Sequence, residues 1–267
     1  MSEILTVQNL HKTFEVGTPN ENHVLKGINL QMKEGDFISI IGGNGAGKST
    51  FLNSIAGSFS SDAGEVILEN KNITELPANQ RAKYISRVFQ DTRMGTASRL
   101  TIEENLSVAM KRGQKRGLSR GIKSKDRDFF KQELKKLHLG LEDRLSMEVG
   151  LLSGGQRQAL TLLMATIVTP KVLLLDEHTA ALDPKTSEMV TGLTEQLVYE
   201  KGISTLMITH NMQHAIEQGN RLIMLHEGNI VVDVRDEEKQ NLTVMELVNL
   251  FQTKSGAELS DDSLILG

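Results

Sequence analysis

Short apolar runs recur along the chain and predict the strands of a sheet. Residues 37–41, FISII, form a compact apolar run that suits a strand buried on both faces. Residues 7–14 and 24–32 read as strands separated by the polar loop GTPNENH, while 221–225 and 229–234 flank HEG as a predicted hairpin. Further strands are predicted at 64–68, 172–176 and 204–210.

Segments between these runs predict helices. FLNSIAGS reads as a short helix that Gly57 closes, because glycine is favoured just beyond a helix end. Thr101 with Glu104, and Thr243 with Glu246, form capping-box patterns, and each opens an amphipathic helix. A further helix is predicted between VLLLD and STLMITH.

The order of these elements predicts the fold class. Strands that alternate with helices imply a parallel α/β sheet. The region 91–150 is charged, helical and poor in strands, which implies a lobe mounted on that sheet. We expect a single domain over residues 1–267, with a helical subdomain at about 91–156 and a C-terminal helix with a polar tail over 235–267.

Composition narrows the class of protein. The chain has 267 residues, 39% of them hydrophobic, which is ample for a core. A net charge of −4 argues against wholesale nucleic-acid binding, and the lack of cysteine excludes disulfides and thiolate metal sites. The start MSEILTVQNL does not resemble a secretory signal, and the most apolar stretch, ALTLLMATIV, is too short to span a membrane. We expect a soluble, cytosolic protein.

The segment GGNGAGKST follows the strand FISII, opens a helix and fits the phosphate-binding pattern G-x-x-x-x-G-K-[ST]. Its glycines let successive backbone N–H groups turn toward phosphate oxygens, and the positive end of the following helix adds a favourable field. Lys48 can reach the β- and γ-phosphates, and the Ser49 hydroxyl can bind Mg²⁺. The predicted nucleotide-binding residues of this loop are Gly42, Asn44, Gly45, Ala46, Gly47, Lys48, Ser49 and Thr50. The spacing excludes a dinucleotide motif, which leaves a purely structural turn as the alternative.

Two carboxylates, Asp176 and Glu177, come directly after the apolar run VLLL. Paired acids at the end of a buried strand are costly through repulsion and desolvation unless a cation or a reaction uses them. We expect Asp176 to hold Mg²⁺, directly or through water, and Glu177 to orient and polarise an attacking water. The alternative is a pair of acids that merely ends a strand.

A second glycine-rich helix start occurs in LLSGGQRQALTLL. Ser153 and Gln156 fit a capping box, yet Gly154 and Gly155 between them are poor helix formers, each costing up to about 1 kcal/mol relative to alanine. Such a start can bind an anion through its open N–H groups. One chain would then have two phosphate-type surfaces but one nucleotide pocket. A two-fold dimer reconciles these if each chain covers the nucleotide held by the other.

LSGGQ, with GGNGAGKST before it and VLLLDE after it, resembles the nucleotide-binding subunit of ABC transporters over nearly the whole chain. The resemblance implies a P-loop NTPase core with a parallel sheet, an antiparallel β subdomain and an inserted helical subdomain. It implies an ATPase that uses ATP and Mg²⁺ and is a homodimer when ATP is bound. In such a dimer Ser153, Gly154, Gly155 and Gln156 would contact the γ-phosphate of the other subunit's ATP, and close backbone approach would explain both glycines.

The resemblance also implies partners. Integral membrane permease subunits and an extracytoplasmic solute-binding protein would complete a transporter, with this chain peripheral at the cytoplasmic face. Import is favoured because the resemblance is to importer ATPases, and DEHTAALD resembles those of tryptophan/tyrosine-type bacterial importers. We predict that Asp91 to Leu106 forms part of the permease-docking surface. The alternative is a soluble ABC ATPase acting on DNA or ribosomes, but the chain has neither a heptad run nor a second cassette, so we expect no nucleic-acid partner.

Four further positions match the family pattern. Gln90, in RVFQD, resembles the glutamine that senses Mg²⁺, and His210, in MITHN, resembles the histidine that contacts the γ-phosphate. Asp183, in AALD, resembles the aspartate that crosses the dimer interface. Phe14 is the candidate for stacking on adenine, and core packing is the equal alternative. The predicted catalytic residues are Lys48, Gln90, Glu177 and His210, and the predicted metal-binding residues are Ser49, Gln90 and Asp176.

Two features depart from, or add to, the family pattern. The family usually has proline after the catalytic glutamate, where this chain has His178, either a tolerated variant or a titratable ring near the nucleotide. Residues 111–127 hold eight basic residues against one acid. This stretch is either a solvated face of the lobe or a surface near anionic lipid or the permease.

Overall fold

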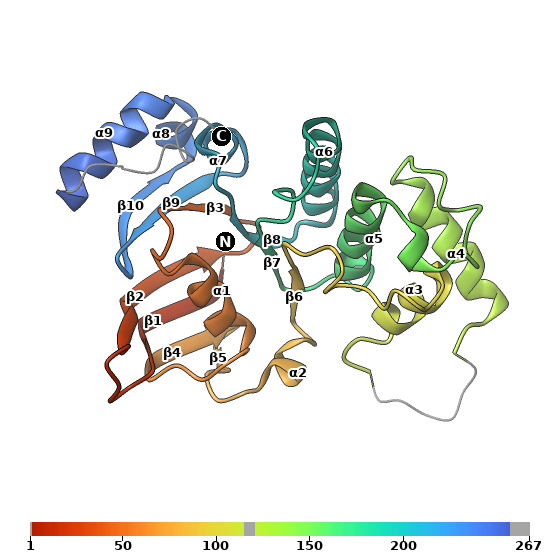
Figure 1. The fold of residues 1–267 in the computed structure, drawn as a ribbon, viewed down its shortest axis with the longest axis horizontal. Helices are drawn as coiled ribbons and strands as arrows, with labels where there is room; N and C mark the ends of the chain where they lie inside the picture. Colours follow the sequence, from red (N-terminus) through yellow and green to blue (C-terminus); the bar gives the residue numbers. More distant parts are fainter. Residues whose placement is uncertain (1, 115–120, 257–267) are drawn as a thin grey trace.

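The structure is a computed structural model that describes residues 2–114 and 121–256. Figure 1 shows two sheets lying close together, with a group of helices extending away from them. Across the described ranges, no helix combines the length and the apolar character that crossing a bilayer requires. Residues 115–120 of the basic stretch and 257–267 of the predicted tail lie outside the described residues.

In the part of the chain that the structure describes, the larger sheet has six strands in the order β10-β9-β3-β8-β7-β6. Their bounds are β3 Phe37–Ile41, β6 Ile85–Val88, β7 Val172–Asp176, β8 Ser204–Ile208, β9 Arg221–His226 and β10 Asn229–Arg235. All pairs are parallel except β9 with β10, which form the predicted hairpin. Every residue of β3, β7 and β8 is buried, which explains why these strands are mostly apolar runs without alternation.

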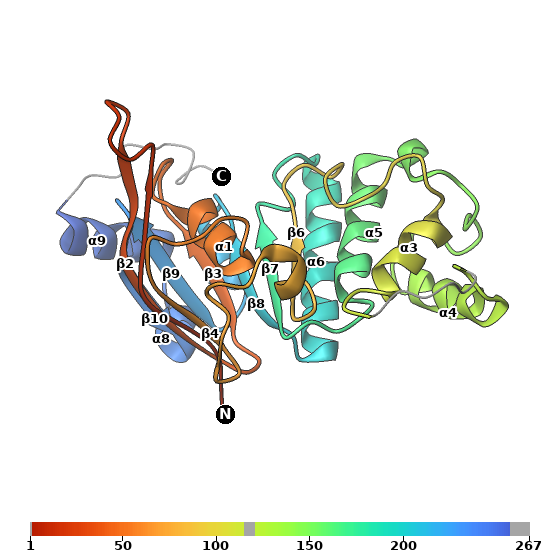
Figure 2. The same cartoon turned by 90° about the horizontal axis from the view of Figure 1, so that it is seen from below.

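The smaller sheet is antiparallel, and helix α1 lies between it and the larger sheet. Its strand order is β2-β1-β4-β5. The bounds are β1 Glu3–Phe14, β2 Asn22–Lys33, β4 Ala63–Leu68 and β5 Lys71–Asn72. Helix α1, Lys48–Ala56, buries Phe51, Leu52 and Ile55 in a core that both sheets share. Figure 2 shows α1 enclosed in this way.

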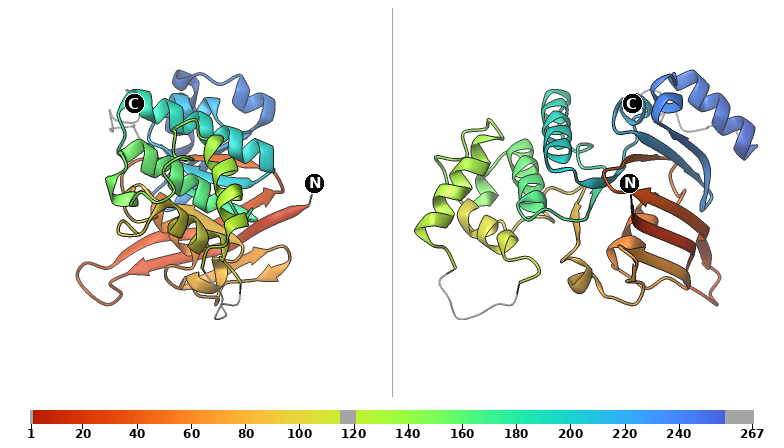
Figure 3. Two further views of the ribbon diagram at one scale, coloured as in Figure 1. Left: turned by 90° about the vertical axis from the view of Figure 1, so that its right-hand side faces the viewer. Right: turned by 180° about the vertical axis from the view of Figure 1, so that it is seen from behind.

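A second hydrophobic core joins the helical lobe to the other face of the six-stranded sheet. The helices of this half are α3 Ile102–Met110, α4 Ser124–Lys135, α5 Gly154–Thr166 and α6 Pro184–Lys201, with a 3₁₀ turn at Val149–Leu151. In this core Leu106 and Phe130 of the lobe pack with Leu163 of α5 and Leu175 of β7. Figure 3 shows α3 and α4 at the far end of the molecule from the small sheet.

The remaining helices are short or lie at the C-terminal end. They are α2 Ala78–Arg81, α7 Met212–Glu217, α8 Asp236–Gln240 and α9 Val244–Ser255. Leu247 and Phe251 of α9 pack with Met212 of α7 and with Val232 of β10 in a third core. The region 235–267 therefore contributes a helix that covers β10.

Most predicted elements are confirmed, including the capping boxes that begin α3, α5 and α9. Strand β1 starts at Glu3 rather than Val7, because Ile4 and Leu5 are also buried. The FLNSIAGS helix starts earlier, at Lys48, and Gly57 closes it with a positive φ of 73°. The short elements β5, β6, α2, α7 and α8 were not predicted, since none carries a long enough apolar pattern.

The parallel order of β3, β8 and β7 sets where the site forms. Carboxyl ends of neighbouring parallel strands meet at one edge of a sheet, where α/β proteins bind ligands. Here β3 leads into the glycine-rich loop, β7 ends at Asp176, and His210 follows β8. The topology thus gathers three of the predicted motifs at one edge.

Candidate active site

Residues 42–50 form a tight loop between β3 and α1. Gly42, Gly45 and Gly47 have positive φ angles of 149°, 77° and 99°. A Cβ atom at Gly42 would lie 2.2 Å from the carbonyl oxygen of Leu225. Gly47 is the N-cap of α1 and no side chain caps the helix, so its first turn faces the loop uncapped. The loop has the curled backbone that a phosphate cradle requires.

Lys48 is buried and its side chain folds back across this loop. The Nζ atom donates to the carbonyl oxygens of Gly42, at 2.7 Å, and Gly43, at 3.2 Å. The loop therefore holds the ammonium in one place, where a fixed positive charge can face phosphate oxygens.

Asp176 lies at the end of β7 and is 8% exposed. Its Oδ1 accepts a hydrogen bond from Ser49 Oγ at 3.4 Å, and its Oδ2 forms an ion pair with Arg87 Nη2 at 2.5 Å. A hydroxyl and a carboxylate oxygen are ligands that Mg²⁺ prefers, and Mg²⁺ usually takes the rest from phosphate and water. Over the described ranges there is no group of three or more His, Cys, Asp or Glu that could hold a metal alone. The residues therefore fit a Mg²⁺ ion that arrives with a phosphate ligand.

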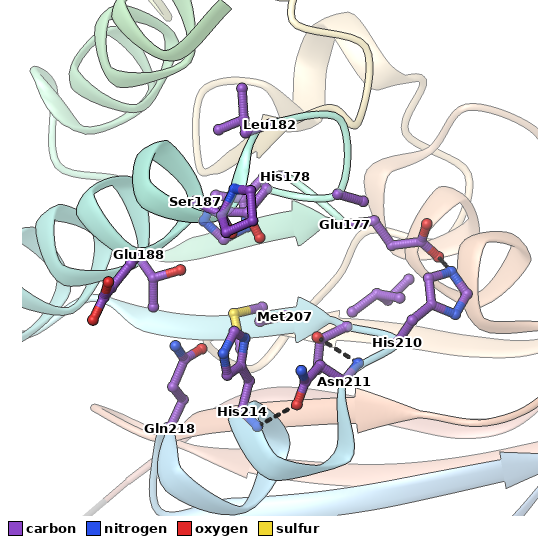
Figure 4. A pocket seen from close by; sticks show the side chains of 16 residues that line it. Glu177, His178, Leu182, Ser187, Glu188, Met207, His210, Asn211, His214 and Gln218 are labelled. Atoms are coloured by element: carbon purple, nitrogen blue, oxygen red, sulfur yellow. Dashed lines mark hydrogen bonds and ion pairs between the residues drawn. The ribbon is translucent and has the colours of Figure 1, made fainter. Parts of the chain in front are cut away.

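Glu177 points toward His210, as Figure 4 shows. Glu177 Oε1 and His210 Nε2 are 2.5 Å apart. The hydrogen bond from His210 lowers the pKa of the Glu177 carboxyl below its usual value; burial opposes the shift, and charge on His210 and Lys48 adds to it. Glu177 is therefore a carboxylate at neutral pH. Its φ of 47° is uncommon for a residue with a Cβ atom, so the backbone here is strained.

His178, the departure from the family pattern, is buried against α6. Its Nε2 lies 2.9 Å from Thr194 Oγ1, and that hydroxyl donates to the carbonyl oxygen of Val190. Burial lowers the pKa of His178 to about 4. The ring is therefore neutral at physiological pH, so of the two interpretations the structure favours a packed variant over a titrating ring.

A pocket of about 510 Å³ opens beside Glu177. The segment between β7 and α6 lines one side, and the segment from β8 into α7 lines the other (Figure 4). Polar side chains at its rim include Glu188, His214 and Gln218. The carboxylate of Glu177 thus stands at the edge of an open space.

The LSGGQ segment begins α5 with a closed capping box. Ser153 Oγ accepts from the Gln156 backbone N–H at 3.3 Å, and Gln156 Oε1 accepts from the Ser153 N–H at 3.2 Å. A Cβ atom at Gly155 would lie 2.1 Å from Thr186 Cγ2 of α6, whereas one at Gly154 would make an ordinary contact of 3.5 Å with Leu182. Packing within the chain therefore gives Gly155 a reason of its own. Close approach of the backbone to a phosphate stays a prediction for both glycines.

The two glycine-rich helix starts lie in different parts of the molecule. Figures 1 and 2 both show β6 and β7 between α1 and α5. Helix α1 belongs to the core shared by the two sheets, and α5 belongs to the lobe core. The structure does not bring Ser153 to the loop that precedes α1 within one chain.

Gln90 and Asp183 lie on exposed segments. Gln90 follows β6 and is exposed. Asp183 is the N-cap of α6, where its Oδ1 accepts from the Thr186 N–H at 3.2 Å, and this bonding lowers the pKa of its carboxyl. Asp183 therefore already has a structural role, independent of any partner.

Phe14 ends β1 and is partly buried. Its ring meets that of Phe59 edge to face at 5.3 Å, and Lys12 Nζ lies 5.4 Å from each ring centroid. Phe14 belongs to none of the three hydrophobic cores of the described residues. The core-packing alternative is therefore disfavoured.

Three residues of this region were missed in the sequence. Arg87 forms an ion pair with Asp176, and Thr194 is hydrogen-bonded to His178. The methyl group of Thr186 fills the space that a side chain at residue 155 would need. Only Arg87 carried a signal, as a charge within the strand segment ISRV. The two threonines lie on α6 at positions that only the packing of helices reveals.

Comparison with known sequences agrees with this geometry. A family described as ABC transporter matches residues 25–180. A tyrosine transport ATP-binding protein of Clostridioides difficile is 45% identical over 93% of this chain and 99% of its own length. The spermidine/putrescine import ATP-binding protein PotA of Mycoplasma mycoides is 32% identical over 86% of this chain, which spans 60% of that protein.

Solved structures show the same fold. The ATP-binding cassette MJ0796, in a dimeric post-hydrolysis state bound to ADP and Pi, superposes with a TM-score of 0.74 at 31% identity, covering 87% of this chain and 98% of that one. The ADP conformation of the cassette MJ1267 gives a TM-score of 0.75 at 27% identity, covering 94% and 99%. The chain therefore belongs to the ABC transporter family and is an ATP-binding, ATP-hydrolysing subunit of such a transporter.

Proposed function

We propose that this ATPase subunit powers solute import, as a homodimer that closes around two ATP molecules. The observation that carries the proposal is the separation of α1 from α5 within one chain, because one subunit then presents two different phosphate-type surfaces. In a two-fold dimer the α5 start of each chain would cover the nucleotide bound at the loop of the other. A relative that forms a dimer, MJ0796 with ADP and Pi, supports this arrangement.

The glycine-rich loop would hold the triphosphate. Backbone N–H groups of residues 42–50 and the Lys48 ammonium would bind the β- and γ-phosphates, and Phe14 would stack on adenine. Ser49 and Asp176, which are hydrogen-bonded to each other, would hold Mg²⁺. Gln90, two residues beyond the end of β6, would be a third ligand. Bound Mg²⁺ supplies charge neutralisation for the phosphate oxygens and orients them.

Glu177 would orient and polarise the attacking water. Its carboxylate is ionised and fixed by His210, so its free oxygen can accept a proton from a water beside the γ-phosphate. His210 holds Glu177 in place and is close enough to the same region to contact the γ-phosphate. The partner's Ser153, Gly154, Gly155 and Gln156 would close the site from the other side, with Asp183 at the subunit interface.

Contact with separate permease subunits would transmit the closing and opening of the dimer to the membrane. Residues 91–106, between β6 and the lobe, include Met94, which is 66% exposed, and Leu151 beyond them is 73% exposed. A contiguous exposed apolar patch on a monomer marks an interaction surface, and we propose that these two side chains belong to such a patch. We therefore place the chain at the cytoplasmic face of the membrane, bound to the permease. Similarity to a tyrosine transport protein points to an amino acid as the solute, delivered by a solute-binding protein.

Replacing Glu177 with glutamine tests the proposal. The variant should bind ATP like the parent, hydrolyse it roughly 10²–10⁴ times more slowly, and accumulate as a dimer in light scattering, because the general base is lost while the cradle is intact. Glu188→Gln, on the same pocket rim and exposed, is the matched control and should hydrolyse ATP normally. Rapid hydrolysis by Glu177→Gln, or a monomer with ATP bound, would contradict the proposal.

A further inference from the structure

Arg87 places a positive charge directly on the carboxylate that is predicted to bind metal. Arg87 Nη2 lies 2.5 Å from Asp176 Oδ2, and the two side chains are only 15% and 12% exposed. At this depth the pair is screened less than a surface ion pair. The negative charge of Asp176 is therefore largely neutralised by a group of the protein itself.

The rest of its surroundings fix Arg87 in this position. Its Nη1 donates to Asn53 Oδ1 of α1, and its guanidinium lies 4.6 Å from the centroid of the Phe89 ring. Its Nε atom is buried without a hydrogen-bond partner among the described residues. Arg87 thus bridges β6, α1 and β7, and among residues 2–114 and 121–256 its one ion-pair partner is Asp176.

A fixed guanidinium weakens a divalent-cation site in two ways. It removes the net charge that Asp176 would offer to the ion, and it repels the ion directly by Coulomb's law. Mg²⁺ loses its hydration water reluctantly and needs strong anionic ligands to do so. The anionic phosphates of a nucleotide would supply the missing charge.

We propose that Arg87 makes metal binding depend on nucleotide, by neutralising Asp176 until phosphate arrives. Arg87 would then make the site selective: it would bind the metal ion together with a nucleotide, and would bind the free metal ion only weakly. This inference rests on the proposed role of Asp176 as a metal ligand. The opposite hypothesis is that Arg87 orients Asp176 for the metal and so strengthens binding; it predicts the opposite sign.

A titration of Mn²⁺ alone into the nucleotide-free full chain distinguishes these two hypotheses. Electron paramagnetic resonance measures the bound Mn²⁺. Arg87→Gln should bind Mn²⁺ at least about tenfold more tightly than the parent, because one nearby positive charge is removed. Arg87→Lys keeps the charge and should stay within about threefold of the parent. Arg127→Gln, the same change in an exposed ion pair with Glu103, is the matched control and should change nothing.

Addition of ADP gives a second measurement. The factor by which ADP tightens Mn²⁺ binding equals the factor by which Mn²⁺ tightens ADP binding. In Arg87→Gln this factor should fall by about as much as the affinity for Mn²⁺ alone rises. Thermal unfolding checks the fold, and Arg87→Met, which removes the charge but keeps length and contact with Phe89, replaces Arg87→Gln if that variant does not fold.

The outcomes distinguish this inference from the proposed function. Unchanged or weaker Mn²⁺ binding in both charge-removing variants overturns the role of Arg87 and leaves Asp176 as a ligand. Adding Asp176→Asn to Arg87→Gln should abolish the gain in affinity. If tight binding persists in that double variant, the ion lies elsewhere and the metal assignment of the proposed function fails instead.

Discussion

The chain contains two glycine-rich helix starts, and they are built on different physical grounds. Helix α1 begins at Gly47, with a φ of 99° and no side-chain cap. Helix α5 begins with a capping box between Ser153 and Gln156, and its glycines have ordinary φ angles. We call the first start open, because no side chain caps it and its shape depends on the positive φ angles of glycines. We call the second start closed, because the side chains of Ser153 and Gln156 cap its backbone N–H groups.

The reason for glycine also differs between the two. At Gly42 a side chain would meet the backbone carbonyl of Leu225, while at Gly155 it would meet a methyl group of Thr186. A backbone atom cannot move aside, but a side chain can be replaced. Similar sequence patterns therefore conceal two different needs for glycine: a fixed backbone contact at Gly42 and a contact with the side chain of a neighbouring helix at Gly155.

The largest effect should come from the open start. Gly42→Ala places a Cβ atom 2.2 Å from the Leu225 oxygen at a positive φ, so backbone strain and overpacking add. We expect a loss of about 4 kcal/mol in the free energy of unfolding, together with loss of ATP binding. Urea unfolding and nucleotide titration measure both.

Gly43→Ala is the control within the same loop. Nothing lies within 4 Å of a Cβ atom there, and the residue has no positive φ. Its stability should stay within about 0.5 kcal/mol of the parent. Equal losses in both variants would mean that the loop rejects any side chain and that the contact with Leu225 is not the cause.

The next largest effect is expected at His178, which packs against α6. His178, bonded to Thr194 of α6, has a pKa of about 4, against 6.5 when unfolded. As the pH falls below 6.5, His178 becomes protonated in the unfolded chain, but in the folded chain it becomes protonated only near pH 4. Stability should therefore fall as the pH drops through this window, by about 3 kcal/mol in total, and be unaffected above it.

Urea unfolding of the parent and of His178→Asn at several pH values from 7 to 4 measures this. Asparagine can still donate to Thr194 but does not titrate, so the difference in stability between the two proteins should narrow or reverse as the pH falls. Parallel curves would show that His178 does not carry the pH dependence.

A smaller effect is expected at the closed start. Gly155→Ala should cost about 2 kcal/mol, because its Cβ atom would overlap Thr186 Cγ2. Adding Thr186→Ser removes that methyl group, keeps the hydroxyl and leaves the backbone N–H that Asp183 binds. Most of the lost stability should return in the double variant, as chemical unfolding of both proteins would show.

Gly154→Ala is the matched control at the adjacent residue. Its Cβ atom would only touch Leu182, at 3.5 Å, and alanine favours a helix, so stability should hold or rise by up to about 1 kcal/mol. If Gly154 approaches the partner's phosphate, dimer formation with ATP should weaken in spite of this. A Gly154→Ala protein that dimerises normally with ATP would contradict close phosphate approach at Gly154, and would leave packing against Thr186 as the reason for Gly155 alone.

The fold could be predicted well where burial writes a clear pattern. The buried strands at Phe37–Ile41 and Val172–Asp176 had predicted bounds that match, because both faces must be apolar. The capping boxes fixed the starts of α3 and α9. The two-residue strand β5 and the one-turn helix α2 escaped, since elements this short are stabilised by tertiary contacts rather than by their own sequence.

The site could be predicted only in part. Asp176, Glu177 and His210 lie at or just beyond the ends of β7 and β8, and Ser49 lies in the first turn of the helix that follows β3. The order of the motifs along the chain was therefore enough to bring Ser49 to Asp176 and His210 to Glu177. Arg87 came from an edge strand whose register no local pattern sets, and its contact with Asp176 depends on the pairing of β6 with β7. The sequence identifies the motifs, but it does not show which residues from other strands contact them and change their charge, as Arg87 does at Asp176.

The left-handed backbone at Glu177 has an evolutionary consequence. Glycine, and to a lesser degree asparagine, would relax this conformation, so either would be expected to make the folded chain more robust while removing the carboxylate. A library of variants screened only for heat tolerance would therefore drift away from glutamate at this position. Glutamate persists there only under selection for turnover, so its retention or loss in laboratory lineages would report which demand is acting.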